Sequence, residues 1–537
     1  MADARTWISA WWRDSHNLFA IKAENRETSA FVASKLAIMN IDSITCYRAL
    51  LAHDARFDGQ FFTCVKTTGI YCRPICPVRP PKFENCIFVP TTAAAQNAGF
   101  RPCLRCRPEY SPEVDELRGT PSVISRALSL IEEGALDEAS VGSFAARLGV
   151  GERQLRRLFQ RHFGANPITV AQTRRLLLAK RLIHETDLPL IEISHASGFL
   201  SLRRFNETFL RFFKCPPSAF RQDGLIQSTT SGISLLLSYR APYDWAAMMA
   251  FLAARAIPGI EFVTGDEYKR VIAFQDEIGS IAVSHVPEKS ALRATICFPI
   301  LSLLPTIIMR IRRIFDLGAN PLVIADALGR DPLLSRLVEA HPGLRVPGAW
   351  DGFEIAVRAI LGQQITVAAA TRLAGKLVKQ LGQPIASDLG VDGLTHAFPR
   401  PDCFDRDVIA SVGMPLQRAA ALSALAEAVL ADPQLFEVRR DLVEAVTAFC
   451  RLPGVGDWTA QYIAMRALRE SDAFPAGDIA LQRVLAEDGI RPTAKSLTAR
   501  AESWRPWRAY AALYLWTADP IGTNKPLKQE NHNALMA

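Results

Sequence analysis

The sequence predicts a multidomain, mainly α protein. Its 537 residues are too many for one hydrophobic core, and the usual domain size suggests about three to four domains. Hydrophobic residues make up 49% and charged residues 22%, as in ordinary globular proteins. Three regions differ in composition: a cysteine-rich segment, a basic segment with an internal repeat, and a long C-terminal half. We expect a small α/β domain, an all-α double helix-turn-helix domain and an α+β domain with a helix-hairpin-helix, for the reasons given below with each region.

The apolar stretches give no sign of export or of a membrane span. The first nineteen residues contain acidic groups and no small-residue cleavage site, so they do not form a secretory signal. Residues 294–309 are too few to cross a bilayer and are interrupted by Pro299 and Pro305, which favours a strand that passes into a helix. The net charge of +8 favours a polyanionic partner such as nucleic acid, although many mildly basic surfaces bind nothing. We expect a cytoplasmic protein without membrane contact.

The cysteines cluster near the N-terminal end. Seven of the 11 fall between Cys46 and Cys106, which favours metal over disulfides in a chain that looks cytosolic. Two pairs have chelating spacing, Cys72 and Cys76 in "CRPIC" and Cys103 and Cys106 in "CLRC", and four thiolates satisfy a tetrahedral zinc ion. Burial or redox pairing is the alternative. The cysteines without a close partner are predicted to be small core residues: Cys46, Cys64 and Cys86.

The segments "FDGQFFTCVKTTGIYCRPICPVRPP" and "ENCIFVPTTAAAQNAGFRPCLRCRPE" resemble the amino-terminal domain of the Ada methyl-damage sensors over about residues 54–109. The resemblance implies that the four cysteines hold one zinc ion. It also implies that Cys72, which follows T-T-G-I, irreversibly takes a methyl group from a methylphosphotriester in DNA. Zinc would keep the sulfur a thiolate near neutral pH. Loss of one formal charge beside a phosphate backbone would tighten DNA binding, so methylation would act as a switch.

Residues 140–221 carry 14 Lys/Arg against 5 Asp/Glu, so their net +9 exceeds that of the whole chain. The segment contains an approximate repeat, "SVGSFAARLGVGERQLRRLFQRHFG" and "PLIEISHASGFLSLRRFNETFLRFF". Each copy has a small residue, a glycine and then apolar residues at helical spacing. These are Ala145, Gly149, Leu155, Leu158 and Phe159 in the first copy and Ala196, Gly198, Phe205, Phe209 and Phe212 in the second. The spacing predicts two helix-turn-helix units.

The pair, with "GFLSLRRFNETFLRFFKCPPSAFR" near its end, resembles the DNA-binding domain of AraC-type regulators. The resemblance implies that helices beginning near Glu152 and Ser201 enter successive major grooves. Family members often have glycine at the position of Cys215. The candidate contacts to bases or phosphates are Glu152, Arg153, Gln154, Arg156, Leu202, Arg203 and Arg204. For each arginine, a phosphate contact or plain solvation is the alternative to base reading.

The C-terminal half follows a Ser-, Thr- and Gly-rich linker at 227–232. Its informative stretch is "LPGVGDWTAQYIAMRAL", followed by "AFPAGDIALQRVL". Pro453, Gly454 and Gly456 predict a tight hairpin between two helices, whose free backbone N–H groups can hold one phosphate. This is a helix-hairpin-helix, a grip that does not read sequence. Asp478, about twenty residues later, is either a helix cap after Gly477 or a catalytic group.

Residues 239–516 resemble the AlkA branch of the helix-hairpin-helix DNA glycosylases. The matching motifs include "YRAPYDW", "FLAARAIPG", "RIFDLGANP", "GLRVPGAWDGFEIAVRAILGQQITVAAA", "LPGVGDWTAQYIA" and "WRPWRAYAALYLW". The resemblance implies that Asp478 is the catalytic aspartate, which stabilises an oxocarbenium-like sugar. Related enzymes that also cleave the strand carry a lysine two residues after G-V-G, where this chain has Trp458. We therefore expect a monofunctional glycosylase.

The same resemblance implies a pocket for a base flipped out of the duplex. Trp458, Tyr462 and Trp516 would form aromatic walls that stack on an electron-poor alkylated purine, although any one tryptophan could equally be core. Gln364 in "LGQQIT" would be a wedge that fills the gap left by the base, and some relatives have leucine there. A sodium or potassium ion at the hairpin is also implied by the resemblance.

These parts predict a bifunctional adaptive-response protein with two activities. It would hydrolyse the N-glycosidic bond of alkylated bases of the 3-methyladenine class, and it would accept a methyl group from DNA methylphosphotriesters on Cys72 to activate transcription. The alternative is a glycosylase only, whose zinc and helix-turn-helix domains are DNA-binding modules without a regulatory role. The P-C-H-R motif of alkylguanine methyltransferases does not occur, so that activity is not expected. The expected partners are alkylated and promoter double-stranded DNA and, for an activator, RNA polymerase. We expect a monomer.

The predicted domains are as follows: 1–38, an extension that resembles nothing in the Ada pattern; 39–113, the zinc and methyl-acceptor domain; 119–225, the double helix-turn-helix domain; 233–345, the AlkA-like N-terminal α/β domain; 346–522, the helix-hairpin-helix glycosylase domain; and 523–537, a tail. Met39 is a reasonable alternative translation start.

Overall fold

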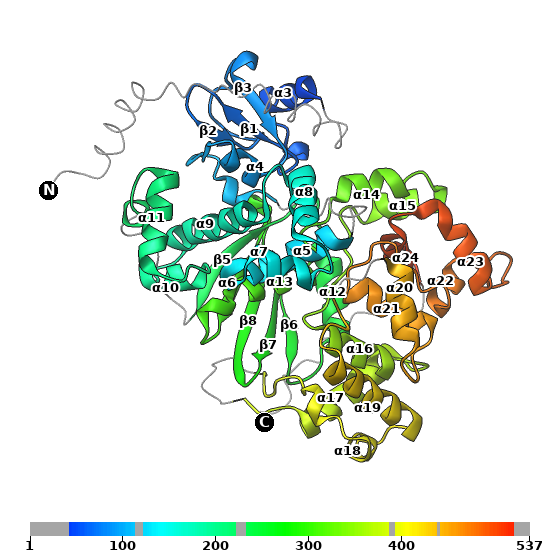
Figure 1. The fold of residues 1–537 in the computed structure, drawn as a ribbon. Helices are drawn as coiled ribbons and strands as arrows, with labels where there is room; N and C mark the ends of the chain where they lie inside the picture. The colour runs from blue at the N-terminus through cyan, green and yellow to red at the C-terminus, as the bar shows by residue number, and fades with distance from the viewer. Residues whose placement is uncertain (1–41, 113–121, 222–231, 386–392, 438–440, 520–537) are drawn as a thin grey trace, which may run out of the picture. The chain divides into compact units, whose positions relative to one another are not determined.

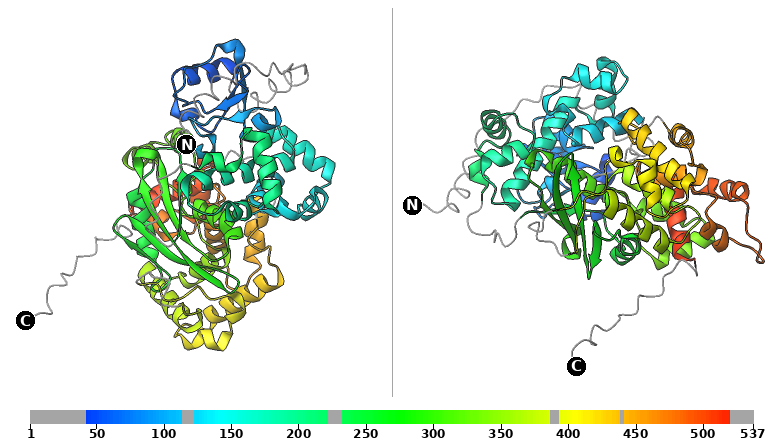
Figure 2. Two further views of the ribbon diagram at one scale, coloured as in Figure 1. Left: turned by 90° about the vertical axis from the view of Figure 1, so that its left-hand side faces the viewer. Right: turned by 90° about the horizontal axis from the view of Figure 1, so that it is seen from below.

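The computed structural model describes residues 42–112, 122–221, 232–385, 393–437 and 441–519 (Figures 1 and 2). The described residues divide into two compact units: 42–112, 127–221 and the short stretch 301–306 form the first, and 122–126, 232–300 and 307–519 form the second. The predicted extension 1–38, the start at Met39, the tail 523–537 and all of the linker except Gly232 lie outside the described residues.

Residues 42–112, called the cysteine module below, form a four-stranded sheet with short helices. Its elements are α3 (Ser43–Leu51), η1 (Ala55–Phe57), β1 (Phe62–Val65), β2 (Ile70–Cys72), η2 (Phe83–Asn85), β3 (Cys86–Val89), α4 (Thr92–Asn97), β4 (Arg101–Pro102) and η3 (Pro108–Tyr110). The strand order is β3-β1-β2-β4, with β1 antiparallel to both neighbours and β2 parallel to β4. Cys46 and Cys64 are fully buried, which confirms them as core residues, whereas Cys86 is only half-buried, at the edge of the cluster that contains Cys46. Burial raises the pKa of Cys46 to about 12.

The basic segment folds into the two predicted helix-turn-helix units. The helices are α5 (Ser122–Glu132), α6 (Ala135–Glu138), α7 (Val141–Arg147), α8 (Glu152–Phe163), α9 (Pro167–Glu185), α10 (Leu190–Ala196) and α11 (Leu202–Phe213), followed by η4 (Pro217–Phe220). Side chains of Ser140, Asn166 and Ser201 accept hydrogen bonds from first-turn amides and so define where α7, α9 and α11 begin. Gly149 and Gly198 make the two turns with φ of 71° and 84°, a conformation that glycine adopts without steric cost.

Two details of this region differ from the sequence prediction. The buried positions of α8 and α11 end at Phe163 and Phe213, whereas Leu158 and Phe212 are only half-buried. The reason is that a buried stripe at i, i+4 and i+8 continues one turn further along each helix. The left-handed residue that ends α11 is Lys214, with φ 61°, so the position that favours glycine precedes Cys215 by one residue.

Within the first unit, the cysteine module packs on α9, the helix that joins the two helix-turn-helix units. Lys180 of α9 lies 2.8 Å from both carboxylate oxygens of Glu109, and the two side chains are 0% and 1% exposed. The buried amide of Gln96 donates to the hydroxyl of Tyr71 (3.1 Å) and accepts from Thr173 of α9 (2.9 Å). These paired polar groups hold the two modules together, because each would be costly to bury alone.

The second unit contains a five-stranded antiparallel sheet in the order β5-β9-β8-β7-β6 (Figures 1 and 2). Its strands are β5 (Ile233–Ser238), β6 (Glu261–Thr264), β7 (Glu267–Phe274), β8 (Glu277–Val286) and β9 (Ala291–Cys297), and α12 (Trp245–Arg255) lies between β5 and β6 in sequence. The apolar stretch 294–309 is the end of β9 followed by η6 (Leu301–Leu303) and the start of α13 (Leu304–Ile314), as predicted. Among the described residues, no helix is long and apolar enough to cross a membrane.

The rest of the second unit is helical and packs around two hydrophobic cores. Its helices are α14 (Pro321–Leu328), α15 (Pro332–Ala340), α16 (Gly352–Leu361), α17 (Val367–Leu381), η8 (Pro401–Cys403), α18 (Arg406–Ser411), α19 (Leu416–Ala431), α20 (Leu442–Cys450), α21 (Asp457–Arg466), α22 (Ile479–Val484), α23 (Ala494–Arg500), η9 (Ala501–Trp504) and α24 (Arg508–Thr517). One core forms between α16, α17, α19, α20 and α21, and the other lies around α24.

A buried ion network joins the sheet to α16. Arg270 of β7 and Arg358 of α16 both bind the carboxylates of Glu261 and Glu354, at distances from 2.5 to 3.7 Å. Burial alone would raise the pKa of Glu354, but the two guanidinium groups hold it down at about 2. The network therefore fixes α16 against the sheet, and α16 leads directly into the turn described below as a candidate DNA contact.

We predict that Lys180→Met lowers the free energy of unfolding of the first unit by about 3 to 5 kcal/mol, because the carboxylate of Glu109 is then buried without a cation. Hydrogen exchange of the α9 amides in the full-length protein measures this loss. The double variant Lys180→Met/Glu109→Leu should recover most of it. A loss below about 1 kcal/mol in the single variant would show that water reaches the pair.

Candidate functional site

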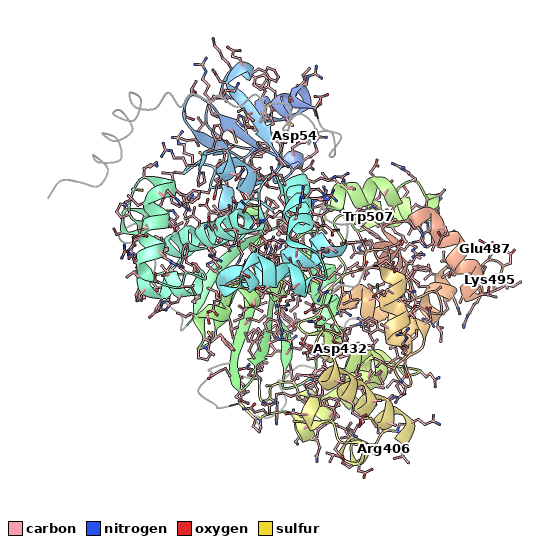
Figure 3. The ribbon with its side chains drawn as sticks, viewed as in Figure 1. Asp54, Arg406, Asp432, Glu487, Lys495 and Trp507 are labelled. Carbon is pink, nitrogen blue, oxygen red and sulfur yellow. The ribbon has the colours of Figure 1, made fainter. Side chains whose placement is uncertain are left out.

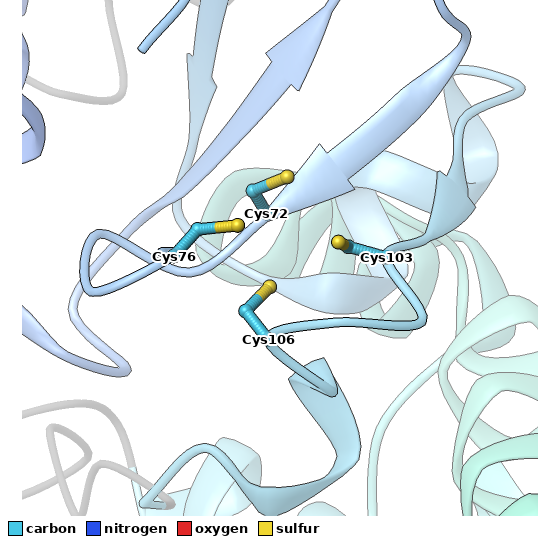
Figure 4. A group of neighbouring side chains, drawn as sticks. All are labelled: Cys72, Cys76, Cys103 and Cys106. Carbon is cyan, nitrogen blue, oxygen red and sulfur yellow. The ribbon is translucent and has the colours of Figure 1, made fainter. Parts of the chain in front are cut away.

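The structure brings the four predicted zinc ligands into one cluster (Figure 4). The sulfur atoms of Cys72, Cys76, Cys103 and Cys106 all lie within 4.8 Å of one another. Four sulfurs around zinc at about 2.3 Å lie roughly 3.8 Å apart, so the cluster can close on the ion with small side-chain shifts. All four are free of disulfides. The donor set and its geometry fit a structural zinc ion.

The backbone explains why the two pairs meet. The parallel pairing of β2 with β4 aligns Tyr71 with Pro102, and the amide of Cys103 donates to the carbonyl of Tyr71 (3.0 Å). Both strands therefore end at the same edge of the sheet. The turn after β2 closes with a bond from the amide of Cys76 to the carbonyl of Arg73 (3.1 Å), which folds the second cysteine of "CRPIC" back toward the first.

Arg73 and Asp58 support the cluster, and the sequence alone did not identify them as a pair. The amide of Arg73 donates to the sulfur of Cys106 (3.3 Å), and its guanidinium donates to the carbonyl of Cys106 (3.2 Å) and to the buried carboxylate of Asp58. Cys72 is half-buried, whereas the other three cysteines are 3 to 7% exposed. The only sequence signal for this support is the arginine inside "CRPIC".

The predicted DNA-contact residues lie on the first turns of α8 and α11. Their side chains are exposed except that of Leu202, which is half-buried. Two of the arginines already have partners on their own helix: Arg156 pairs with Glu152 (2.7 Å), and Arg203 pairs with Glu207 (2.8 Å). Such exposed pairs contribute little to stability and can exchange for phosphate contacts.

In the second unit, Asp478 lies at the N-terminus of α22 and accepts four N–H groups. Its Oδ1 accepts from the amides of Ala480 (2.9 Å) and Leu481 (3.1 Å), so it caps the helix. The indole of Trp458 donates to Oδ2 (2.9 Å), and the indole of Trp516 donates to Oδ1 (3.1 Å). Asp478 is therefore a helix cap, and two of the predicted pocket residues also donate to it, whereas its catalytic role stays a prediction.

The three aromatic residues come from two helices. Trp458 and Tyr462 lie one turn apart on α21 and stack with ring centroids 5.4 Å apart and planes 10° apart. Trp516 lies on α24, which begins after Trp507 (labelled in Figure 3). All three residues are half-buried. A half-buried carboxylate can stabilise positive charge, and the stacked rings of Trp458 and Tyr462 can bind a flat, electron-poor group.

The hydroxyl of Tyr462 faces cationic groups, which the sequence did not reveal. Arg466, one turn later, donates to this hydroxyl (2.5 Å) and to the carbonyl of Gly348 (3.0 Å). Desolvation would raise the pKa of Tyr462, but the nearby guanidinium groups of Arg466 and Arg255 hold it below its ordinary value. These contacts fix the ring of Tyr462 against Trp458.

The predicted hairpin joins α20 to α21. Pro453, Gly454 and Gly456 are exposed and Val455 is buried, so the loop is anchored by one side chain while its backbone faces outward. Gly454 has φ 76°, and a Cβ there would lie 2.7 Å from the Cβ of Ala421. Aspartates accept first-turn amides in neighbouring helices such as α16, α20 and α22, but the N-cap residue of α21 is Gly456, which has no side chain to accept them. Its first amides are therefore available to an anion.

Gln364 lies at the tip of the turn between α16 and α17. Its side chain is exposed and its φ is 60°, in the left-handed region. A residue of this kind is held there by its surroundings, since the conformation is costly for a side chain with a Cβ. The preceding residue, Gln363, was not singled out from the sequence, although its side chain is bonded to the hairpin.

Comparisons with known proteins match each part of the chain. Four family models match: the metal binding domain of Ada at residues 45–109, a helix-turn-helix domain at 144–223, the AlkA N-terminal domain at 234–351, and the HhH-GPD superfamily of base excision DNA repair proteins at 357–509.

Three curated proteins illustrate the relationship. The chain is 40% identical to the "Probable bifunctional transcriptional activator/DNA repair enzyme AlkA" of Mycobacterium tuberculosis, over 89% of this chain and 97% of that protein. It is 33% identical to DNA-3-methyladenine glycosylase 2 of Escherichia coli, over 52% of this chain and 95% of that protein. It is 34% identical to the bifunctional transcriptional activator/DNA repair enzyme Ada of Escherichia coli, over 22% of this chain and 33% of that protein.

Proposed function

The chain belongs to the family of bifunctional transcriptional activator/DNA repair enzymes of the AlkA type, and we propose from this that it releases alkylated bases from DNA and activates transcription in response to methyl damage. The base-release activity is a DNA glycosylase activity of the AlkA type. The observation that supports it most directly is the carboxylate of Asp478, which accepts the indole N–H groups of Trp458 and Trp516. Trp458 lies in the first turn of α21, the helix that follows the hairpin. The proposed substrates are bases of the 3-methyladenine class in double-stranded DNA.

In the proposed reaction, the flipped base stacks against the aromatic walls and its sugar lies at Asp478. Alkylation makes the base cationic, so it leaves as a neutral molecule and needs no added proton. As the N-glycosidic bond breaks, the sugar becomes oxocarbenium-like, and the carboxylate stabilises that charge. Water then adds to the sugar and loses a proton. The four N–H groups that Asp478 accepts keep its oxygens in one orientation throughout.

The protein would leave the resulting abasic site intact. A lyase needs an amine that attacks the sugar and forms a Schiff base, and Trp458 stands where strand-cleaving relatives carry that lysine. An indole nitrogen that donates to Asp478 is no nucleophile. We propose that Gly454 and Gly456 bind a phosphate beside the lesion through backbone amides and that Gln364 enters the gap left by the base.

The cysteine module is proposed to be the sensor. When bound, zinc would hold the four sulfurs as thiolates near neutral pH. The sulfur of Cys72 attacks the methyl carbon of a methylphosphotriester, an S–CH₃ bond forms, the O–CH₃ bond breaks, and the phosphodiester leaves as an anion. The thioether carries one negative charge less than the thiolate, which favours binding to promoter DNA through α8 and α11. Recruitment of RNA polymerase, a monomeric state and a cytoplasmic location complete the proposal.

We predict that Asp478→Asn lowers single-turnover release of 3-methyladenine by about a hundredfold to a thousandfold, because the developing positive charge loses its anion. Asn can still cap α22, so the fold should persist. Asp331→Asn is the matched control: Asp331 caps α15 and accepts the indole of Trp504 (2.9 Å), and its change should leave release unaffected. Equal loss in both variants would reduce Asp478 to a structural cap.

Borohydride treatment during turnover should trap no protein on DNA, because no amine attacks the sugar. The product strand should remain uncut until alkali is added. Gel analysis of the DNA and of the protein measures both results. A borohydride-dependent covalent complex would contradict the monofunctional assignment and would call for a search among the lysines of the second unit.

Incubation with DNA methylated on its phosphates should add one methyl group to Cys72, as measured by peptide mass spectrometry. Cys450, which is exposed on α20, is an internal control that should stay unmodified. Promoter affinity should rise after methylation, and the rise should shrink as salt increases. A methylated Cys72 without a gain in affinity would favour the glycosylase-only alternative, in which the sensor and helix-turn-helix modules merely bind DNA. An unmodified Cys72 in zinc-loaded protein would leave the cluster a structural clamp.

A further inference from the structure

The side chain of Gln363 connects the turn that carries Gln364 to the hairpin. Its amide nitrogen donates to the carbonyl of Gly454 (2.9 Å) and to the hydroxyl of Thr459 (3.0 Å). Gly454 lies in the hairpin and Thr459 in the first turns of α21, where it is 2% exposed. A single side chain thus spans two segments about ninety residues apart in sequence.

A third element bonds to the backbone of the same residue. Arg418, near the start of α19, donates to the backbone carbonyl of Gln363 (2.7 Å). Ala421, one turn further along α19, is the residue that a Cβ on Gly454 would strike. The turn and the hairpin are therefore both fixed against α19, and Gln363 is the point at which all three are hydrogen-bonded together.

This arrangement explains how Gln364 can remain in a left-handed conformation. Such a conformation is sterically unfavourable for a residue with a Cβ, so the neighbouring atoms must hold it. Gln363, the residue immediately before Gln364, is held by four hydrogen bonds: two through its side chain, one through its carbonyl, and one from its amide to the carbonyl of Ile360 (3.3 Å). A methionine at 363 could fill the same space, but it has no N–H group to donate.

We propose that Gln363 is a positioning residue for base flipping, which keeps the wedge at Gln364 in register with the phosphate held by the hairpin. The proposal rests on the glycosylase function proposed above. The hairpin determines where the DNA backbone lies, and the wedge must enter the base stack at one step of that backbone. A rigid link between them converts phosphate binding into correct placement of the wedge, and a loose link lets the two contacts form out of register.

The decisive experiment is a double-mutant cycle between Gln363→Met and Gln364→Ala. Flipping is measured with 2-aminopurine placed next to one methylated purine in a duplex, in an Asp478→Asn background where the base stays on its sugar. Gln363→Met should reduce the flipping signal roughly tenfold to a hundredfold when Gln364 is present, and should have little further effect in the Gln364→Ala variant. Additive losses would overturn the proposal, because Gln363 would then not act through the wedge.

Two further measurements separate positioning from simple damage to the fold. Affinity for undamaged duplex should change less than about twofold in Gln363→Met, since the hairpin keeps its anchor at Val455. A parallel loss of this affinity would instead make Gln363 part of the phosphate grip and would overturn the proposal. Gln383→Met, at an exposed glutamine just beyond α17, is the matched control and should behave as the unaltered protein.

The outcomes also distinguish this proposal from the one on which it rests. If the unaltered protein releases no alkylated base, the glycosylase proposal fails. If it releases the base and Gln363→Met releases and flips the base equally well, the glycosylase proposal stands and the positioning role of Gln363 is wrong. Thr459→Val removes one of the two acceptors and should give an intermediate loss of flipping, whereas no loss would count against the link.

Discussion

Three helices of the second unit meet at one carboxylate, which both caps a helix and accepts two indole N–H groups. Asp478 caps α22, a helix of six residues that needs its first amides satisfied, and it also accepts the indoles of Trp458 and Trp516. These bonds tie α21, α22 and α24 together at one point. Asp331 caps α15 in a similar way and accepts a hydrogen bond from one indole, that of Trp504. An aspartate that caps a helix and also binds a tryptophan therefore has a structural role in this fold. The second indole and the stacked ring of Tyr462 distinguish Asp478.

A network of buried charged side chains holds α16 in place against the sheet. Arg270 and Arg358 share two carboxylates between the sheet and α16, and α16 ends at the turn that carries Gln363. A buried ion network adds little net stability, because desolvation cancels much of the attraction, but it tolerates few geometries. Its contribution is therefore placement: the antiparallel sheet holds α16, α16 sets the turn, and the turn is bonded to the hairpin.

The sequence predicted those features that depend on local spacing. The cysteine pairs, the starts of α8 and α11, the glycine turns and the hairpin all follow from residues within a few positions of one another. It did not predict the pairs formed between residues far apart in the chain, such as Lys180 with Glu109 or Gln363 with Gly454. The local sequence around each residue does not indicate which distant residue it contacts. The same limit applies to the ends of the buried stripes. Phe163 rather than Leu158 completes the core, because packing against neighbouring helices determines which residues of the last turn are buried.

The first unit gives a physical reason why a methyl group on Cys72 could matter to the helix-turn-helix helices. One formal charge is screened over about 8 to 10 Å in physiological salt, so its direct effect on distant phosphates is small. The cysteine module, however, is joined to α9 through buried bonds of Gln96 and Glu109, and Thr91 of the same module donates to the carbonyl of Phe163 at the end of α8 (2.7 Å). A stronger contact between the module and one phosphate would therefore strengthen the binding of α8 and α11 to the same duplex. When the module and these helices form one rigid body, binding of one part already places the other on the DNA, so the second contact costs little further entropy. This gain requires a stiff connection between the module and the helices, which the buried Lys180–Glu109 pair supplies.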